Sequence, residues 1–208
     1  MPLVVVAHPL VRHKMGILRC VDTSTSKFRE LTREITCLLA YECFRSLEME
    51  KSTVEGWART VEVEKLSGKK FVVVPRLRAG LGMLPGVLDL IPGARINLVG
   101  AHDLEDSAGT NLYYHKLSCD AAARLMVILD PILATGNSLS AVVDLLKKVQ
   151  CKDIRVLCLI AAPEGALMME KRHPDVSIYV AALDEGLDPN RFVLPGLGDA
   201  GDRLFGTK

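Results

Sequence analysis

The sequence lacks the features that mark several broad classes of protein. Its 208 residues carry a formal net charge of only +1, so the charge balance does not indicate binding to a nucleic acid or to a membrane surface. No apolar run approaches the roughly 20 residues that a helix needs to cross a bilayer. The first residues, MPLVVVAHPLVRHK, lack the leading positive charge and long apolar core of a signal peptide. We therefore expect a soluble, cytoplasmic protein with neither a nucleic acid nor a membrane as its partner.

Several metal and nucleotide motifs are also missing. The six cysteines include no CxxC pair, and none lies at zinc-ligand spacing from histidines, so we expect reduced, structural thiols and no metal held by the protein alone. No GxxxxGK[ST] motif is present, which excludes a P-loop nucleotidase. In RAGLGMLPG, three residues separate Gly82 from Gly86 where the dinucleotide fingerprint has two, and Pro85 interrupts the helix that should follow. The sequence gives no pattern that indicates a Ser/His/Asp or Cys/His arrangement for covalent catalysis.

What the chain does contain is an alternation of strand and helix patterns. Apolar segments bounded by Gly, Pro or Asp are typical of strands buried on both faces of a sheet; those predicted are Leu3–Val6, Phe71–Val74, Arg95–Val99, Leu125–Leu129, Ile154–Ile160 and Val176–Ala182. Segments of helical period run from Phe28 to Phe44, after a Ser/Thr-rich start, and from Leu139 to Val149. We predict one α/β domain over residues 1–208, with a mostly parallel central sheet flanked by helices and ligands at the carboxyl ends of the strands.

Two segments depart from this alternation. Residues 102–118, HDLEDSAGTNLYYHKLS, are polar and then aromatic, with glycine in the middle, and we predict a hairpin or projecting loop. The last fifteen residues, LPGLGDAGDRLFGTK, contain four glycines and two aspartates, and their apolar side chains indicate that the segment is anchored. The one tryptophan, Trp57, is expected to contribute to packing.

The segment VILDPILATGNSL, residues 127–139, carries the first candidate site. The predicted strand ends at Asp130, and a turn of small residues leads to a helix starting near Ser138, so backbone N–H groups surround one point that attracts a phosphate. Thr135 and Ser138 add hydroxyl donors, and Gly136 lets the backbone come close. Asp130 suits two adjacent hydroxyls of a sugar. The alternative is an ordinary strand–turn–helix connection, with Asp130 capping and Ser138 as the N-cap.

A second candidate lies in VVVPRLRAGLGM, residues 72–83. If the chain is extended there, Arg76 and Arg78 point the same way, because side chains alternate along a strand. The small residues Ala79 and Gly80 leave the backbone accessible, and two guanidinium groups beside open amides suit a multiply charged anion. The alternative is a pair of surface arginines at the end of a strand.

Several motifs together resemble uracil phosphoribosyltransferase, of the type I phosphoribosyltransferase family: DPILATGNS, PRLRAGLGM, AAPEG, HPDV and PGLGDAGDRLFGTK, with similarity from HPLVRHK to the last residue. The resemblance implies that uracil and 5-phospho-α-D-ribose 1-diphosphate (PRPP) are converted to UMP and diphosphate in pyrimidine salvage, aided by Mg²⁺ held largely through the diphosphate. It also implies a homo-oligomer, and GTP as an allosteric effector, because the family commonly forms oligomers and some members respond to GTP.

The same resemblance assigns residues to the substrates. Arg78, Asp130 and Asp199 take the catalytic roles, with Arg78 as the arginine that meets the diphosphate. The uracil site falls in the C-terminal segment 184–208, at Val193, Gly198, Asp199 and Ala200. The PRPP site comprises Arg78, Asp103, Asp130, Pro131, Ile132, Leu133, Ala134, Thr135, Gly136, Asn137, Ser138 and Asp199.

Four positions depart from the family pattern. Asp103 stands where the family usually has an arginine that contributes to PRPP binding, and an acid there should repel this ligand. Asn137 replaces a glycine of the turn and is able to adopt left-handed geometry almost as glycine does, while Phe192 replaces a tyrosine. Arg76 replaces an apolar residue, and we hypothesise that it partly restores the missing positive charge.

These departures keep two rival functions open. One is a non-catalytic or weakly active nucleotide-binding regulator descended from the family, which Asp103 and Phe192 favour. The other is a phosphoribosyltransferase for a different base. The retained GLGDAGD segment, which is specific to the uracil enzymes, argues against this second rival.

Overall fold

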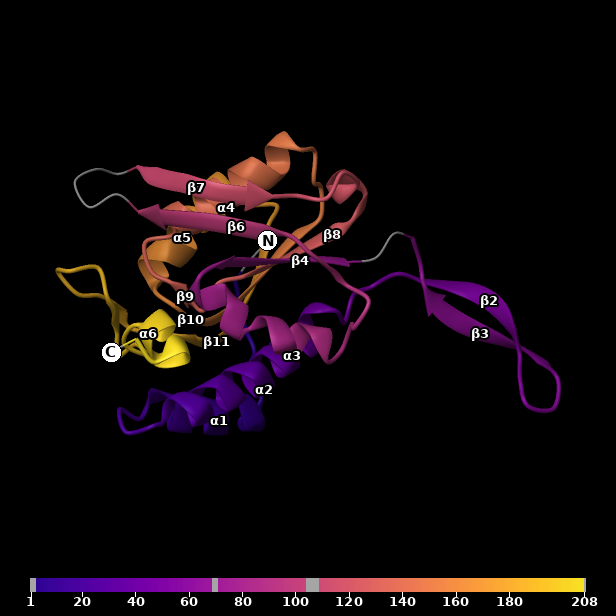
Figure 1. Cartoon of the computed structure of the whole chain (residues 1–208), viewed down its shortest axis with the longest axis horizontal. Helices are drawn as coiled ribbons and strands as arrows, with labels where there is room; N and C mark the ends of the chain where they lie inside the picture. Colours follow the sequence, from indigo (N-terminus) through magenta and orange to yellow (C-terminus); the bar gives the residue numbers. More distant parts are fainter. Residues whose placement is uncertain (1–2, 69–70, 104–108, 208) are drawn as a thin grey trace.

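The computed structural model describes residues 3–68, 71–103 and 109–207 (Figure 1). Its centre is a nine-stranded sheet that contains β1 (Leu3–Val5), β11 (Ser177–Leu183), β10 (Ile154–Ala161), β8 (Leu125–Leu129), β4 (Phe71–Leu77), β6 (Leu98–Asp103) and β7 (Thr110–Lys116), in this spatial order. Two short strands join it: β5 (Arg95–Ile96) pairs with β4, and β9 (Ile132–Leu133) pairs with β10. These pairings are parallel except that of β6 with β7. The predicted α/β fold with a mostly parallel sheet is confirmed.

Helices cover both faces of the sheet and bury two apolar cores. The first core involves α1 (Pro9–Arg19), α2 (Thr25–Cys43), α3 (Leu84–Leu88) and α6 (Ala200–Phe205), and the second α4 (Asn137–Lys148) and α5 (Pro163–Arg172). The strands supply alternate side chains to the two cores, because successive residues point to opposite faces. In β4, Val73 belongs to the first core, and Val72 and Val74 belong to the second. Each large apolar side chain buried in this way stabilises the fold by roughly 1.5–3 kcal/mol.

Both predicted helices are present. The segment predicted from Phe28 to Phe44 is α2, which begins earlier because Ser24 caps it, its Oγ accepting the Lys27 N–H at 3.3 Å. The segment predicted from Leu139 corresponds to α4. Among the described residues, no helix combines the length and the apolar character that crossing a bilayer requires.

The predicted strand Arg95–Val99 is instead divided between β5 and β6. Asn97 lies between the two strands, where its side-chain oxygen accepts the Ser118 N–H at 3.0 Å. Its own N–H donates to Val73 O at 2.9 Å. A polar side chain engaged in this way interrupts what the apolar pattern indicated to be one continuous strand.

Helix α1 and a projecting hairpin were not predicted. Helix α1 starts with Pro9 and is capped by His8, whose Nδ1 accepts the Leu10 N–H at 3.2 Å. The hairpin of β2 (Met49–Glu55) and β3 (Thr60–Leu66) extends away from the sheet (Figure 1). Trp57 lies in the connection between these strands and is fully exposed, so the expectation that it contributes to packing is wrong.

The segment 102–118, for which a hairpin or projecting loop was predicted, includes the end of β6 and all of β7. The two strands pair antiparallel, from Leu98 opposite Lys116 to Asp103 opposite Thr110. Residues 104–108, in the middle of the predicted hairpin, lie outside the described residues.

The carboxyl ends of β4, β8 and β10 meet at one edge of the sheet, and the segments leaving this edge pack closely against one another. A Cβ on Gly80, just after β4, would lie 2.3 Å from Leu129 O at the end of β8. A Cβ on Gly165 in α5 would lie 2.2 Å from Ala134 O. Glycine at position 80 therefore lets the segment that carries Arg78 approach the end of β8. Glycine at position 165 lets α5 approach the segment that carries Ala134.

Replacing Gly165 by alanine tests this packing. The added methyl group has no room beside the Ala134 carbonyl oxygen, so we expect the free energy of unfolding to fall by about 1–3 kcal/mol. A Cβ on Gly16, which lies on the exposed side of α1, would meet no atom within 4 Å. Gly16→Ala should therefore raise the free energy of unfolding by about 0.5–1 kcal/mol. Urea denaturation measures both values, and a change of the same sign in the two variants would contradict the packing argument.

Candidate active site

A cavity of about 610 Å³ opens at the carboxyl edge of the sheet. It is bounded by the ends of β4, β6 and β8, by the turn before α4 and by the C-terminal segment. All but one of the site residues assigned from the sequence line it, Asn137 being the exception: Arg78, Asp103, Asp130, Pro131, Ile132, Leu133, Ala134, Thr135, Gly136, Ser138, Val193, Gly198, Asp199 and Ala200. The fold thus brings together residues that are widely separated in the sequence.

The turn between β9 and α4 directs the start of a helix at this cavity. Gly136 is the N-cap of α4 and has a φ of +83°, and a Cβ there would lie 2.7 Å from Met168 Cε in α5. The left-handed backbone favours glycine, and a side chain would also require the end of Met168 to move. The first N–H groups of α4 have no acceptor within the helix, so the turn can bind an anion such as a phosphate.

Asn137 and Ser138 are the first two residues of α4. Asn137, which was considered able to adopt left-handed geometry, does not need to, because the left-handed residue of the turn is Gly136. The Asn137 N–H donates weakly to Thr135 Oγ1, over 3.4 Å. Because Gly136 is the N-cap, the alternative in which Ser138 caps the helix is wrong.

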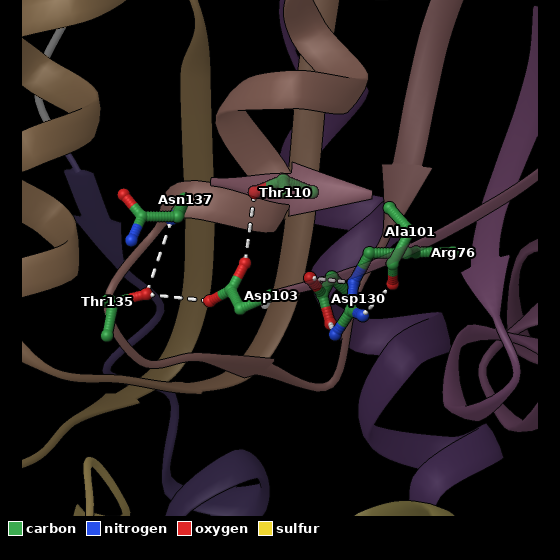
Figure 2. Close-up of polar contacts among 7 residues, drawn as sticks. All are labelled: Arg76, Ala101, Asp103, Thr110, Asp130, Thr135 and Asn137. Atoms are coloured by element: carbon green, nitrogen blue, oxygen red, sulfur yellow. Dashed lines mark hydrogen bonds and ion pairs between the residues drawn. The ribbon is translucent and has the colours of Figure 1, made fainter. Parts of the chain in front are cut away.

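Asp130 forms a buried ion pair with Arg76 (Figure 2). Arg76 Nε donates to Asp130 Oδ2 at 2.6 Å and Arg76 Nη2 to Asp130 Oδ1 at 2.7 Å, while Nη1 reaches Ala101 O at 3.1 Å. Burial disfavours the charged guanidinium, but the Asp130 carboxylate outweighs it and the pKa of Arg76 is raised. Arg76 and Arg78 both line the cavity, but Arg76 neutralises Asp130 and does not provide an unpaired cation beside Arg78.

Asp103 contacts the anion-binding turn directly. Its Oδ2 accepts the Thr135 hydroxyl at 3.1 Å, and its Oδ1 accepts the Thr110 hydroxyl at 3.1 Å (Figure 2). One carboxylate thereby connects β6, β7 and the turn. It also occupies the hydroxyl proton of Thr135 and places negative charge beside the position where an anion would bind.

Arg78 is held by helix α6. Its Nη2 donates to Asp202 Oδ1 at 2.9 Å, its Nη1 to Thr207 Oγ1 at 3.3 Å, and its guanidinium lies 5.3 Å from the centre of the Phe205 ring. Asp199 is the N-cap of the same helix and accepts the Asp202 N–H at 2.9 Å. A Cβ on Gly201 would lie 3.1 Å from Asp199 Oδ1 and 3.4 Å from Arg78 Nη2, so this glycine allows the two charged groups to approach each other.

The C-terminal segment that carries Val193 and Gly198 is fixed by ion pairs and backbone contacts to the start of the chain. Arg19, at the end of α1, forms a bidentate ion pair with the buried Asp184 and donates to Gly196 O at 2.7 Å. Asp184 in turn accepts the Gly196 N–H at 3.0 Å. Glu164 of α5 holds the nearby Leu187 N–H at 3.1 Å.

Sequence reasoning missed several residues that build this site. Arg19 and Asp184 carried no motif, and they lie far apart in the chain, so no local signal could have found them. Arg203 lies within the PGLGDAGDRLFGTK motif, but nothing local indicated its long-range contact with Cys20. Its guanidinium joins Leu197 O at 3.0 Å to Cys20 O at 2.6 Å. Other cavity-lining residues were not assigned to either substrate; they are Arg76, Ala79, His102, Leu139, Ile160, Arg191, Phe192, Leu197 and Gly201.

The carboxylates of the cavity are already engaged within the protein. Asp130 is paired with Arg76, Asp103 accepts two hydroxyls, and Asp199 caps α6. Among the residues that the structure describes, no group of three or more His, Cys, Asp or Glu side chains could hold a metal ion.

The cysteines are all free and none lines the cavity. Burial raises the pKa of Cys43 to about 12 and raises the pKa of Cys151 and Cys158 above the ordinary thiol value. These three buried thiols stay protonated near neutral pH, and thiolate chemistry is therefore not expected of them.

Comparison with known proteins places this site in a family. A sequence model described as uracil phosphoribosyltransferase matches residues 5–207. The AQ2163 protein of Aquifex aeolicus has a similar structure, with a TM-score of 0.94 and 34% sequence identity over 99% of this chain and 99% of that chain.

More distant solved structures share the fold. A hypoxanthine-guanine phosphoribosyltransferase from Bacillus anthracis gives a TM-score of 0.51 at 17% identity, over 77% of this chain and 80% of that chain. A hypoxanthine phosphoribosyltransferase from Trypanosoma cruzi, in complex with IMP, gives 0.51 at 12% identity, over 76% and 75%. Because the family model spans nearly the whole chain, the protein belongs to the uracil phosphoribosyltransferase family.

Proposed function

We propose that the protein transfers the phosphoribosyl group of PRPP to uracil, giving UMP and diphosphate. The family and the fold identify the chain as a phosphoribosyltransferase of nucleotide salvage. The observation that carries the choice of substrates is the composition of the cavity. It combines an anion-binding turn, the arginine Arg78 and a glycine-containing segment of exposed backbone in one space.

The ribose 5-phosphate part of PRPP suits the turn before α4. Its phosphate would accept hydrogen bonds from the first N–H groups of α4 and from the Ser138 hydroxyl. Asp130 would accept from the two ribose hydroxyls. Arg76 uses one acceptor position on each oxygen of Asp130, and a carboxylate oxygen has a second. Arg76 is therefore a positioning residue that holds Asp130 in one orientation.

Uracil suits the backbone of the C-terminal segment. The base presents two carbonyl acceptors and two N–H donors, and the backbone around Gly198 offers donors and acceptors at close range. Gly198 has a φ of +68°, a left-handed conformation that favours glycine. Cytosine would place an amine where uracil has a carbonyl, leaving a backbone donor unpaired, so such a site discriminates against it.

Departure of the diphosphate leaves positive charge on C1′ of the ribose and negative charge on the leaving group. Arg78 would stabilise the leaving group, because it retains N–H donors beyond those used on Asp202 and Thr207. When bound through the diphosphate of PRPP, Mg²⁺ would neutralise part of the negative charge of the leaving group. No covalent nucleophile is required, since positioning the two substrates supplies much of the remaining acceleration.

The rival function, a non-catalytic nucleotide-binding regulator, is favoured by one observation. The Asp103 carboxylate lies against Thr135 of the anion-binding turn, where it opposes a phosphorylated ligand. Formation of UMP separates the two functions.

Incubation of the protein with uracil, PRPP and Mg²⁺ should yield UMP, quantified by chromatography. Arg78→Met should lower kcat/KM by about 100-fold or more, because it removes a donor to the leaving group. Arg12→Gln, on the exposed side of α1 and outside the cavity, should leave activity unchanged, and thermal melting checks that both variants fold. Absence of UMP at saturating substrate would support the regulator, and a product formed only with another base would exclude uracil as the substrate.

Asp103→Asn should lower the Michaelis constant for PRPP. The amide has nearly the same shape but removes a negative charge beside the phosphate, a repulsion of about 1 kcal/mol, or roughly fivefold in affinity. Glu64→Gln, an exposed change of equal charge on β3, provides the control. Steady-state kinetics at varied PRPP give the result, and an increase in the constant for Asp103→Asn alone would mean that this carboxylate assists binding.

Arg76→Ile should destabilise the protein and raise the Michaelis constant for PRPP. The variant leaves the buried Asp130 carboxylate without its partner, which lowers the free energy of unfolding by about 3–5 kcal/mol. Asp130→Asn should also destabilise, and the double variant should lose less than the sum of the two. Urea denaturation measures the stabilities, and kinetics are compared at a temperature where all variants are folded. An unchanged Michaelis constant would end the hypothesis that Arg76 supports PRPP binding.

A further inference from the structure

Arg191 has an unusual backbone conformation in the loop between β12 (Gly186–Leu187) and β13 (Val193–Leu194). The Arg191 N–H donates to Asp188 O at 2.9 Å, and Asp188 and Phe192 are joined by two further bonds of 2.8 Å. These contacts close a tight turn that places Arg191 at a φ of +68°. The turn thus requires a left-handed residue at this position.

Arginine is a costly choice for that position. Glycine adopts a left-handed backbone freely, whereas a side chain introduces strain. The other non-glycine residue with positive φ in the described parts of the chain, Gln150, follows the end of α4, where such a residue commonly terminates a helix. Arg191 has no helix to end, and it lines the candidate active site. Strain retained beside a binding cavity indicates that the side chain has a role there.

The charges of the cavity indicate what that role is. Of its three arginines, Arg76 is paired with Asp130 and Arg78 with Asp202. Arg191 is exposed, and its guanidinium forms no ion pair or hydrogen bond with the described residues. Its loop (gold, at the left of Figure 1) projects from the same end of the molecule as the β6–β7 hairpin and leads directly into Val193 of the cavity wall. Among the described residues, an unpaired guanidinium thus lies at the rim of a cavity whose two other arginines are both ion-paired.

We propose that Arg191 is a binding residue for the diphosphate group of PRPP, an inference that rests on the proposed function. The 5-phosphate has the donors of the turn before α4, whereas the diphosphate carries more charge and, among the described residues assigned to it so far, has one cation, Arg78, which is shared with Asp202. Asp103 adds a negative charge that a second guanidinium would offset. A planar guanidinium can donate two parallel hydrogen bonds to a phosphate, which lysine cannot.

Binding measurements on the intact protein test this assignment. Isothermal titration with PRPP and Mg²⁺, with inorganic diphosphate and Mg²⁺, and with UMP should be compared for wild type, Arg191→Gln, Arg191→Lys and Arg191→Gly. We expect Arg191→Gln to weaken PRPP and diphosphate about tenfold and UMP, which has no diphosphate, by less than twofold. Arg191→Lys should retain part of the affinity. Arg12→Gln removes a charge outside the cavity and should change none of the three.

Arg191→Gly separates charge from backbone effects. Glycine relieves the left-handed strain, so this variant should melt about 2–4 °C above wild type and yet lose the same affinity as Arg191→Gln. Unchanged diphosphate and PRPP binding in Arg191→Gln would overturn the role of Arg191 alone. Equal weakening of UMP would overturn the assignment to the diphosphate. A wild-type protein that binds neither PRPP nor diphosphate would overturn this inference together with the proposed function.

Discussion

The ion pair between Arg76 and Asp130 joins the strand ends around which the cavity is built. Arg76 belongs to β4, Asp130 follows β8, and Arg76 also donates to Ala101 O in β6. Removing either charge would leave the other buried without compensation, so the two groups persist only as a pair. The pair therefore fixes three neighbouring strand ends relative to one another. It also orients Asp130, the residue assigned to the ribose hydroxyls, before any ligand arrives.

The balance of positive and negative side chains in the cavity affects how a polyanion can bind there. The cavity is lined by the arginines 76, 78 and 191 and the aspartates 103, 130 and 199, so its formal charges cancel. A balanced lining gives little long-range attraction. In the proposed reaction, PRPP would depend on short, directed contacts from the first turn of α4, from hydroxyls and from guanidinium groups. Such contacts orient the substrate more than they attract it, which suits a reaction accelerated mainly by positioning.

Sequence patterns predicted the elements whose signals lie close together in the chain, and they missed the contacts between residues that lie far apart in it. The passage from β8 through the turn to α4 followed from an apolar run, small residues and a helical period, all between residues 125 and 148. The pairing of Asp130 with Arg76 was not predicted, because the two residues lie 54 positions apart in the chain. They meet because β4 and β8 are neighbouring strands. The ion pair between Arg19 and Asp184, which holds the C-terminal segment, was missed for the same reason, because these residues lie 165 positions apart. Strand alternation placed Arg76 on the cavity side correctly but could not show which charge it meets.

Two of the left-handed positions that line the cavity, Gly136 and Arg191, differ in what they permit. At Gly136 a side chain would strain the backbone, and its Cβ would also meet Met168 Cε at 2.7 Å and Gly165 O at 3.1 Å, so both the backbone and its neighbours favour glycine. Arg191 lies in an exposed loop, where the cost of a side chain is confined to its own backbone strain. The turn before α4 therefore packs closely against α5, whereas the charge at the rim of the cavity can change at position 191 with a cost that is confined to the backbone strain of that residue.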